Sequence, residues 1–216
     1  MRKYKYVFWD LDGTISDSAP GIIHSVTYAL EHMGTKVPDL DKLKKFVGPP
    51  LSESFSLYVG DSKEKVNAAV NYFREYYEKT GIYENEMYNG IEELLIKLRD
   101  AGYISVLATS KPEPHAITIL KRYGIDNYFQ YIAGSTFDET RTKKAEVIAY
   151  ALEACGITDK SQVIMIGDRS HDVIGAKENN LDCIGVLYGY GDRPELEEAG
   201  VIAIAADLNE LASILI

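Results

Sequence analysis

Short, mostly apolar runs alternate with amphipathic segments through most of this chain. The runs that we expect to form strands are Tyr4–Trp9, Tyr103–Ala108, Tyr131–Ala133, Val163–Ile166, Cys183–Leu187 and Val201–Ile204. Apolar residues at consecutive positions are typical of parallel strands that helices cover on both faces. Between these runs apolar residues recur at helical spacing, as at Ile91, Leu94, Leu95 and Leu98. The alternation predicts an α/β fold with a doubly wound, Rossmann-like parallel sheet.

One stretch, from Ser16 to Tyr88, breaks this alternation. It shows no convincing strand, only helical periodicity such as the stripe of Val66, Val70, Phe73 and Tyr77. About seventy helical residues are too many for one crossover connection. We therefore expect residues 16–88 to form an all-helical subdomain inserted into a core of residues 1–15 and 89–216.

Composition and charge narrow the range of functions. The 216 residues are 46% hydrophobic, enough to bury a core without a disulfide between Cys155 and Cys183. With 33 acidic and 23 basic residues the net charge is -10, which disfavours nucleic-acid partners. No apolar run approaches the roughly 20 residues that span a bilayer. We expect a cytoplasmic protein that binds neither nucleic acid nor membrane.

The first candidate for chemistry is the string Asp10-Leu11-Asp12-Gly13-Thr14, directly after the first apolar run. In open α/β sheets, ligands bind at the carboxyl ends of the strands, and Gly13 allows a tight turn there. The alternative is an acidic turn in which Asp12 and Gly13 are turn residues only.

A second acidic string, Gly167-Asp168-Arg169-Ser170-His171-Asp172, follows the run Val163–Ile166. Asp168 and Asp172 are four residues apart, so a helix that starts here would place them on one face. The alternative is that Asp168 caps the helix and Asp172 interacts only with its dipole.

Two further strings offer groups that bind anions. Thr109 and Ser110 are expected to supply a hydroxyl and backbone amides at a helix N-terminus, although either residue could simply cap a helix that Pro112 begins. Lys143 and Lys144 open the helix that runs through Val147, where a lysine opposes the helix dipole and indicates a nearby anion. Their alternative is a solvated surface pair.

Taken together, the acidic strings predict a metal site. Asp10, Asp12, Asp168 and Asp172 would repel one another at a shared strand edge unless they are protonated or neutralised. Mg²⁺ solves this, because it binds a few carboxylates together with substrate phosphate. Acids, metal, lysine and threonine around one site are the equipment for phosphoryl transfer through an aspartyl-phosphate.

These strings, in this order, resemble the motifs of the haloacid dehalogenase superfamily of phosphohydrolases, whose helical cap the insert matches. The chain also resembles the phosphoglycolate phosphatase-like and bacterial 5'-nucleotidase-like branch. That finer likeness rests on Gly48-Pro49-Pro50-Leu51, Thr109-Ser110-Lys111-Pro112, Gly167-Asp168-Arg169-x-x-Asp172-x-x-Gly175-Ala176 and Gly185-Val186-x-x-Gly189-Tyr190-Gly191. Many relatives carry proline after the motif lysine, whereas Ala145 follows Lys144 here, so Lys143 stays an alternative for that role.

The resemblance implies a role for each motif residue. Asp10 would attack phosphorus, and Asp12 would protonate the leaving alkoxide and then deprotonate water. Mg²⁺ would be held by the side chains of Asp10 and Asp168 and by the backbone carbonyl of Asp12, with Asp172 orienting the ligands from outside. The phosphoryl oxygens would be bound by Thr109, the Ser110 amide, Lys144 and Gly13.

The expected activity is that of a magnesium-dependent phosphatase for small phosphate monoesters, of the 5'-nucleotide or phosphoglycolate type, acting as a monomer or homodimer. A phosphomutase of the β-phosphoglucomutase type is the first alternative, and a non-catalytic phosphate-binding regulatory protein is the second. Gly48, Pro49 and Arg169 are candidates for substrate contact. Their alternatives are a rigid turn between helices and a surface or ion-pair role.

Overall fold

The computed structural model describes residues 3–138 and 140–216, and the chain divides into two compact units. The first unit is Met1–Ser16 with Met87–Ile216, and the second unit is Asp17–Glu86. The predicted insert of residues 16–88 differs from the second unit by one residue at its start and by two at its end.

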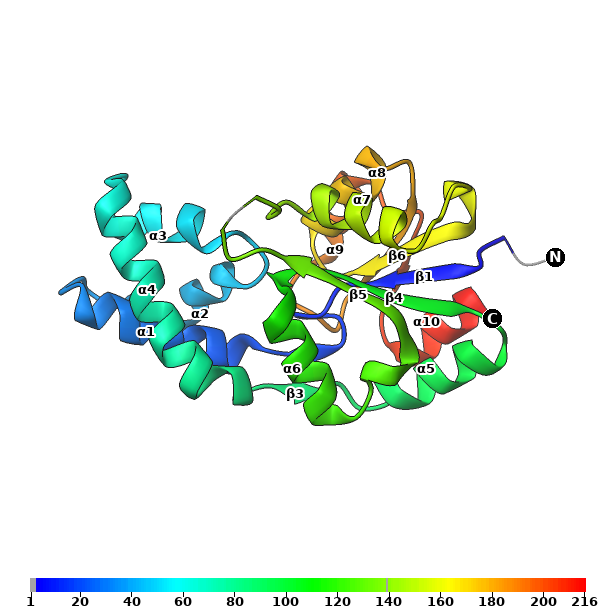
Figure 1. Ribbon diagram of the computed structural model, residues 1–216, viewed down its shortest axis with the longest axis horizontal. Coiled ribbons are helices and arrows are strands. Elements are labelled where there is room, and N and C mark those ends of the chain that lie inside the picture. The colour runs from blue at the N-terminus through cyan, green and yellow to red at the C-terminus, as the bar shows by residue number, and fades with distance from the viewer. Residues whose placement is uncertain (1–2, 139) are drawn as a thin grey trace. The chain divides into compact units, whose positions relative to one another are not determined.

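A parallel sheet forms the centre of the first unit. Among the described residues it has six strands, in the order β5 (Phe129–Ser135), β4 (Ile104–Pro112), β1 (Tyr6–Trp9), β6 (Val163–Gly167), β7 (Asp182–Val186) and β8 (Ala203–Ala205). Every neighbouring pair is parallel, and Figure 1 labels β5, β4, β1 and β6 side by side. This confirms the predicted α/β class. Because β4 lies on one side of β1 and β6 on the other, the strand order reverses at β1, which is where ligands bind in such sheets.

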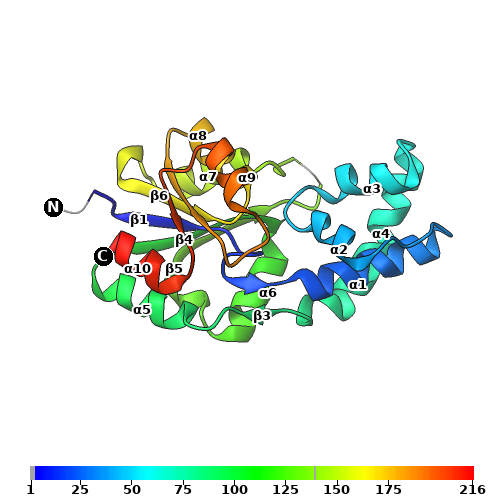
Figure 2. The ribbon, with the colours of Figure 1, turned by 180° about the vertical axis from the view of Figure 1, so that it is seen from behind.

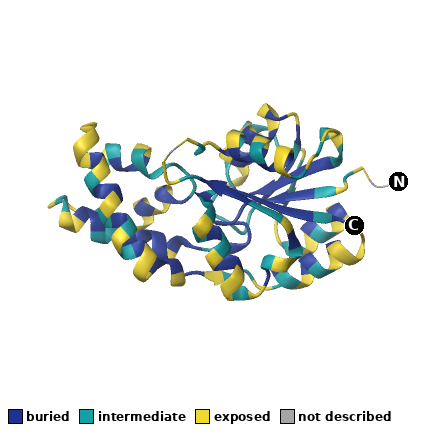
Figure 3. Cartoon of the chain, in the orientation of Figure 1, coloured by how far each residue is buried: buried dark blue, intermediate teal, exposed yellow. Residues whose placement is uncertain are grey.

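Helices cover both faces of this sheet (Figures 1 and 2). One face carries α5 (Ile91–Asp100), α6 (Glu113–Tyr123) and α10 (Leu208–Leu215), and the other carries α7 (Lys144–Ala154), α8 (Ser170–Glu178) and α9 (Arg193–Ala199). The strands are consequently buried along most of their length, as the dark blue arrows of Figure 3 show. Phe8, Val106 and Met165 pack with Val147 and Val173 in one hydrophobic cluster. Double coverage explains why the strands are apolar at consecutive positions.

The end of β4 differs from the prediction. This strand continues to Pro112 instead of stopping at Ala108, and its register against β5 is irregular between Ala108 and Pro112. The helix α6 begins at Glu113 with Pro112 in the cap position. Thr109 and Ser110 therefore lie in a strand, and the expectations that they start or cap a helix were wrong.

The second unit is helical. It contains α1 (Ala19–His32), α2 (Leu40–Leu43), α3 (Leu51–Val59) and α4 (Lys63–Lys79), with short 3-10 turns η1 (Lys44–Phe46) and η2 (Gly81–Tyr83). Its core is aromatic, and the rings of Phe55 and Phe73 lie edge to face with their centroids 6.3 Å apart. A Cβ on Gly21 of α1 would lie 2.0 Å from the carbonyl oxygen of Gly81, so only glycine allows this approach.

The two chain segments that join the units are paired with each other. Ser16–Asp17 (β2) and Glu86–Met87 (β3) form a two-stranded sheet. The expectation that residues 16–88 hold no strand was wrong at both ends, because two residues are too few to leave a periodic pattern. Throughout the described residues, no helix combines the length and the apolar character needed to cross a membrane.

Candidate active site

Six charged side chains are buried in the part of the chain that the structure describes. They are Asp10, Asp12, Lys111, Lys144, Asp168 and Asp172. Asp10, Asp12 and Asp168 follow β1 and β6, Lys111 lies near the end of β4, and Lys144 and Asp172 lie in the first turns of α7 and α8. Burying a charge costs several kcal/mol unless the charge is paired. Their concentration at the switch point of the sheet indicates a site built for chemistry.

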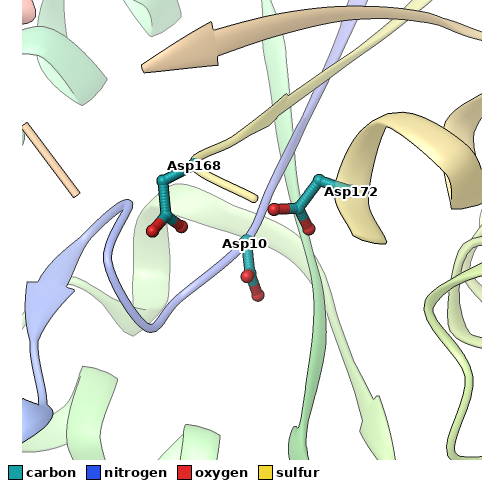
Figure 4. Close-up of side chains that lie close together, drawn as sticks. All are labelled: Asp10, Asp168 and Asp172. Atoms are coloured by element: carbon teal, nitrogen blue, oxygen red, sulfur yellow. The ribbon is translucent and has the colours of Figure 1, made fainter. Parts of the chain in front are cut away.

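Three of the acids form the centre of this site. Asp10, Asp168 and Asp172 each offer one carboxylate oxygen, and these oxygens lie within 4.8 Å of one another (Figure 4). The sheet brings the first two together, because Trp9 and Ile166 are partners in the pairing of β1 with β6. The acids that sequence analysis placed at two strand ends therefore do meet.

The crowding perturbs the ionisation of these carboxyls. Burial raises the pKa of Asp168 well above its ordinary value, and the carboxylates of Asp172 and Asp10 act in the same direction. Burial also raises the pKa of Asp10. There Lys144 and a hydrogen bond from the Thr109 hydroxyl oppose the rise, while Asp172 adds to it. A cation bound among these oxygens would relieve their repulsion.

Neutral donors hold the carboxylate of Asp168 in place. The Thr14 hydroxyl donates to Oδ1 over 3.1 Å, and the Tyr190 amide donates to Oδ2 over 2.8 Å. Gly13 has a φ of +81°, and a Cβ there would lie 2.2 Å from Asp168 Oδ2. Gly13 thus serves the close approach of the first turn to Asp168, and its contact with phosphate stays a prediction.

Lys144 enters this cluster, and Lys143 does not. The Nζ atom of Lys144 lies 2.7 Å from Asp10 Oδ1 and 2.9 Å from Asp172 Oδ1, and it donates to the Ala108 carbonyl over 3.1 Å. Burial alone would lower the pKa of Lys144, but the two carboxylates raise it. The Lys143 side chain is exposed.

The two oxygens of Asp172 have different partners, and its role in orienting metal ligands stays a prediction. Its Oδ2 accepts the Arg169 amide over 3.1 Å at the start of α8, while its Oδ1 faces Lys144. The Arg169 side chain is paired with Glu195 over 2.9 Å, the ion-pair role that was left open for it. Gly48 and Pro49 belong to the second unit, between η1 and α3. Substrate contacts by Gly48, Pro49 and Arg169 stay predictions.

Sequence analysis missed Lys111. Its Nζ lies 2.9 Å from Asp12 Oδ2, and the two side chains are only 5% and 10% exposed. The signal was the strand period of two: from Thr109 onward, burial alternates, so that Thr109 and Lys111 are buried while Ser110 and Pro112 are half-buried. The prediction of a helix at this point concealed the alternation.

The residues present fit a divalent cation. Four carboxylates and two lysines give the six buried groups a formal charge of −2. Apart from the Lys144 ammonium, Asp10 Oδ1 and Asp172 Oδ1 have no hydrogen-bond partner among the described residues. Hard oxygen donors with unused acceptor capacity and a surplus of two negative charges match the requirements of Mg²⁺.

A family model described as haloacid dehalogenase-like hydrolase matches residues 7–186, which include every one of these six groups. The chain belongs to this family. A 5'-nucleotidase of Pseudomonas aeruginosa is 41% identical over 213 residues, which cover 99% of this chain and 96% of that protein. The tyrosine-protein kinase PtkA of Mycobacterium tuberculosis is 39% identical over 95% of this chain and 70% of its own length.

Other relatives of this haloacid dehalogenase-like hydrolase agree with that assignment. A phosphoglycolate phosphatase of Vibrio cholerae is 28% identical over 100% of this chain and 99% of its own. The crystal structure of a predicted phosphatase from Clostridium acetobutylicum, 45% identical, superposes with a TM-score of 0.94 over 98% of both chains. The chain is a phosphoric monoester hydrolase of this family.

Proposed function

We propose that this chain is a magnesium-dependent phosphatase that hydrolyses small phosphate monoesters, of the 5'-nucleotide or phosphoglycolate type, through an aspartyl-phosphate. The observation that carries the proposal is the set of six buried charged side chains at the switch point of the sheet. Two lysines and four carboxylates in a buried place are costly to stability and are explained by a reaction that needs them.

Asp10 is the nucleophile in this proposal. One of its carboxylate oxygens forms a bond to phosphorus while the bond from phosphorus to the ester oxygen breaks. Burial raises the pKa of Asp10, and Lys144 and the Thr109 hydroxyl oppose that rise, so these two groups favour the ionised form that attack requires. Lys144, Thr109 and the Ser110 amide also bind the oxygens of the transferring phosphoryl group.

Mg²⁺, held by the side chains of Asp10 and Asp168 and by the Asp12 carbonyl, would supply positive charge to the phosphoryl oxygens. Asp168 is fixed for this by Thr14 and Tyr190, and Asp172 keeps Lys144 in place.

Asp12 moves the protons. In the first step its carboxyl group gives a proton to the leaving alkoxide, and in the second step the resulting carboxylate takes a proton from the water that cleaves the aspartyl-phosphate. Its Oδ1 atom is buried and has no hydrogen-bond partner among the described residues, so one oxygen is available for this exchange.

The comparisons favour hydrolysis of a small metabolite. The relative named 5'-nucleotidase is 41% identical over nearly the whole chain, and the one named phosphoglycolate phosphatase is 28% identical. A non-catalytic binding protein is disfavoured because every acid and the lysine of the motifs are present. A phosphomutase of the β-phosphoglucomutase type would return phosphate to a sugar phosphate instead of to water.

The test is phosphate release, with Mg²⁺ and with EDTA, from p-nitrophenyl phosphate, phosphoglycolate, nucleoside 5'-monophosphates and sugar phosphates. We expect release that requires Mg²⁺ and that Asp10→Asn abolishes. Asp12→Asn should spare p-nitrophenyl phosphate, whose leaving group needs no proton, more than an alkyl ester. Absence of release from every compound would contradict the proposal, and conversion of a sugar phosphate in the presence of a sugar bisphosphate would then establish the mutase.

A further inference from the structure

We propose that Lys111 is the positioning residue for Asp12: it holds Asp12 Oδ2, so that Oδ1 is the atom that exchanges the proton with the leaving group and then with water. This inference rests on the proposed function, because it assumes that Asp12 is the acid and base. It concerns a residue that the motif comparison left without a role.

The two buried lysines contact different acids of the site. Lys144 contacts Asp10 and Asp172, the nucleophile and its neighbour, at 2.7 and 2.9 Å. Lys111 contacts Asp12 at 2.9 Å. A lysine that served only to bind phosphoryl oxygens or to balance the metal cluster would have no need to face the proton carrier. The division by partner therefore indicates a role in proton transfer.

The two oxygens of Asp12 differ in their surroundings. Oδ2 is paired with the Lys111 ammonium, whereas Oδ1 is buried and has no hydrogen-bond partner among the described residues. A buried acceptor without a hydrogen-bond partner costs about 1–3 kcal/mol. A carboxyl group that was free to rotate would turn to remove this cost. The ion pair prevents that rotation, and it leaves Oδ1 ready for a reacting oxygen.

The contacts of Lys111 join the end of β4 to the turn after β1. Lys111 lies near the end of β4, beyond the residues Ile104–Leu107 that pair with β1, the strand that precedes Asp12. Its amide donates to the Thr109 hydroxyl oxygen over 3.3 Å, and its side chain is 5% exposed. The pair therefore ties the turn after β1 to the neighbouring strand, and a carboxyl group on a tight turn acquires one orientation.

The proton balance is simple. As the Asp10–phosphorus bond forms and the phosphorus–alkoxide bond breaks, the proton on Asp12 Oδ1 passes to the alkoxide and leaves a carboxylate beside Lys111. When water attacks phosphorus, one of its protons returns to the same oxygen and the Asp10 carboxylate departs. Lys111 stays protonated in both steps.

The test separates positioning from phosphate binding by the leaving group. Lys111→Met should lower kcat for 5'-UMP, which leaves as an alkoxide, by about 10²-fold, within the range of general acid catalysis. The loss for p-nitrophenyl phosphate should be about fivefold or less, and Lys111→Arg should restore part of the activity on 5'-UMP. Lys143→Met, which changes an exposed lysine, is the matched control and should leave both rates unchanged.

A double-mutant cycle supplies the second readout. If Lys111 acts through Asp12, adding Lys111→Met to Asp12→Asn should lower kcat for 5'-UMP by less than a further threefold. Independent residues would instead give a loss equal to the product of the two single losses. The double variant also removes both members of the ion pair, so it should fold where Lys111→Met alone is unstable. Lys111→Gln, which keeps a donor, serves the leaving-group comparison in that case.

Two results would overturn the inference while the proposed function stands: equal losses on both esters for the Lys111 variants, or losses that multiply in the double variant. If Asp12→Asn itself lowers both esters equally, the acid role of Asp12 is wrong, and the proposed mechanism fails together with this inference.

Discussion

Replacing Lys144 by methionine removes the ammonium between Asp10 and Asp172 while it keeps an unbranched side chain that is one atom shorter. The lysine is 5% exposed, and its Nζ atom lies within 3 Å of two carboxylates that are themselves 9% and 1% exposed. Methionine leaves both carboxylates buried without this cation. Lys143, the preceding residue, is exposed and provides the matched control, Lys143→Met.

The expected loss of stability is large. Removal of one partner from a buried ion pair costs about 3–5 kcal/mol. For a chain of this length each kcal/mol corresponds to a shift in Tm of about 2–4 °C. Lys144→Met should therefore lower the Tm by about 6–20 °C, whereas an exposed substitution such as Lys143→Met stays within about 2 °C.

The loss should also depend on pH in a known direction. Burial and Asp172 raise the pKa of Asp10, and Lys144 opposes that rise. Without Lys144 the pKa in the folded protein rises further above its value in the unfolded chain. A carboxyl with a raised folded pKa contributes stability at low pH that is lost as the pH rises through that value. The difference in Tm between wild type and Lys144→Met should be larger at pH 8 than at pH 5.

Thermal unfolding followed by circular dichroism, in EDTA at pH 5 and pH 8, measures both quantities. Equal Tm values for the Lys143 and Lys144 variants would refute the reasoning. A Tm difference that shrinks as the pH rises would refute the assigned cause, since it would mean that the ammonium is not what keeps Asp10 ionised.

Three further predictions concern the same site. Asp10→Asn should abolish turnover of p-nitrophenyl phosphate without changing the circular dichroism spectrum. Loss of a nucleophile ordinarily leaves about a thousandth of the activity or less. Residual turnover above about 1% of wild type would therefore contradict the assignment of Asp10 as the nucleophile. Mg²⁺ at a hundred times its Kd should stabilise the protein by about 2.7 kcal/mol, or raise its Tm by about 5–11 °C, and Asp168→Asn should eliminate this shift; an unchanged shift would place the metal elsewhere. Gly13→Ala, with a positive φ and a Cβ 2.2 Å from Asp168 Oδ2, should lower the urea midpoint well beyond Gly34→Ala, whose φ of +63° is also positive but whose Cβ meets nothing within 4 Å; equal midpoints would mean that Asp168 moves aside freely.

Hydrophobic periodicity and the positions of the strand ends predicted where several of the acids of this site would lie. Because parallel strands end at one edge, two acids that follow two apolar runs could be expected to meet, and Asp10 and Asp168 do. The choice between Lys143 and Lys144 could not be made in this way. Adjacent residues on a helix differ by about 100° in direction, and the first residue of α7 was not determined closely enough to assign a face.

Lys111 was missed for a different reason. The run Tyr103–Ala108 was taken to end where polar residues begin, since burial in a sheet is ordinarily apolar. In a functional site the strand continues through polar residues, because ionic partners replace apolar ones, and β4 extends to Pro112 in this way. A prediction based on hydrophobicity therefore ends a strand too early where the strand contributes polar residues to a functional site.

The pairing of β2 with β3 has a consequence for how this chain could change without losing its core. Neighbouring strands lie about 4.8 Å apart, so the second unit begins and ends at nearly the same point. The first unit therefore has to span only about one strand spacing between the two ends of Asp17–Glu86, whatever the length of that segment. We expect that Asp17–Glu86 can be exchanged for another compact insert, with the strands and the six buried charges left as they are.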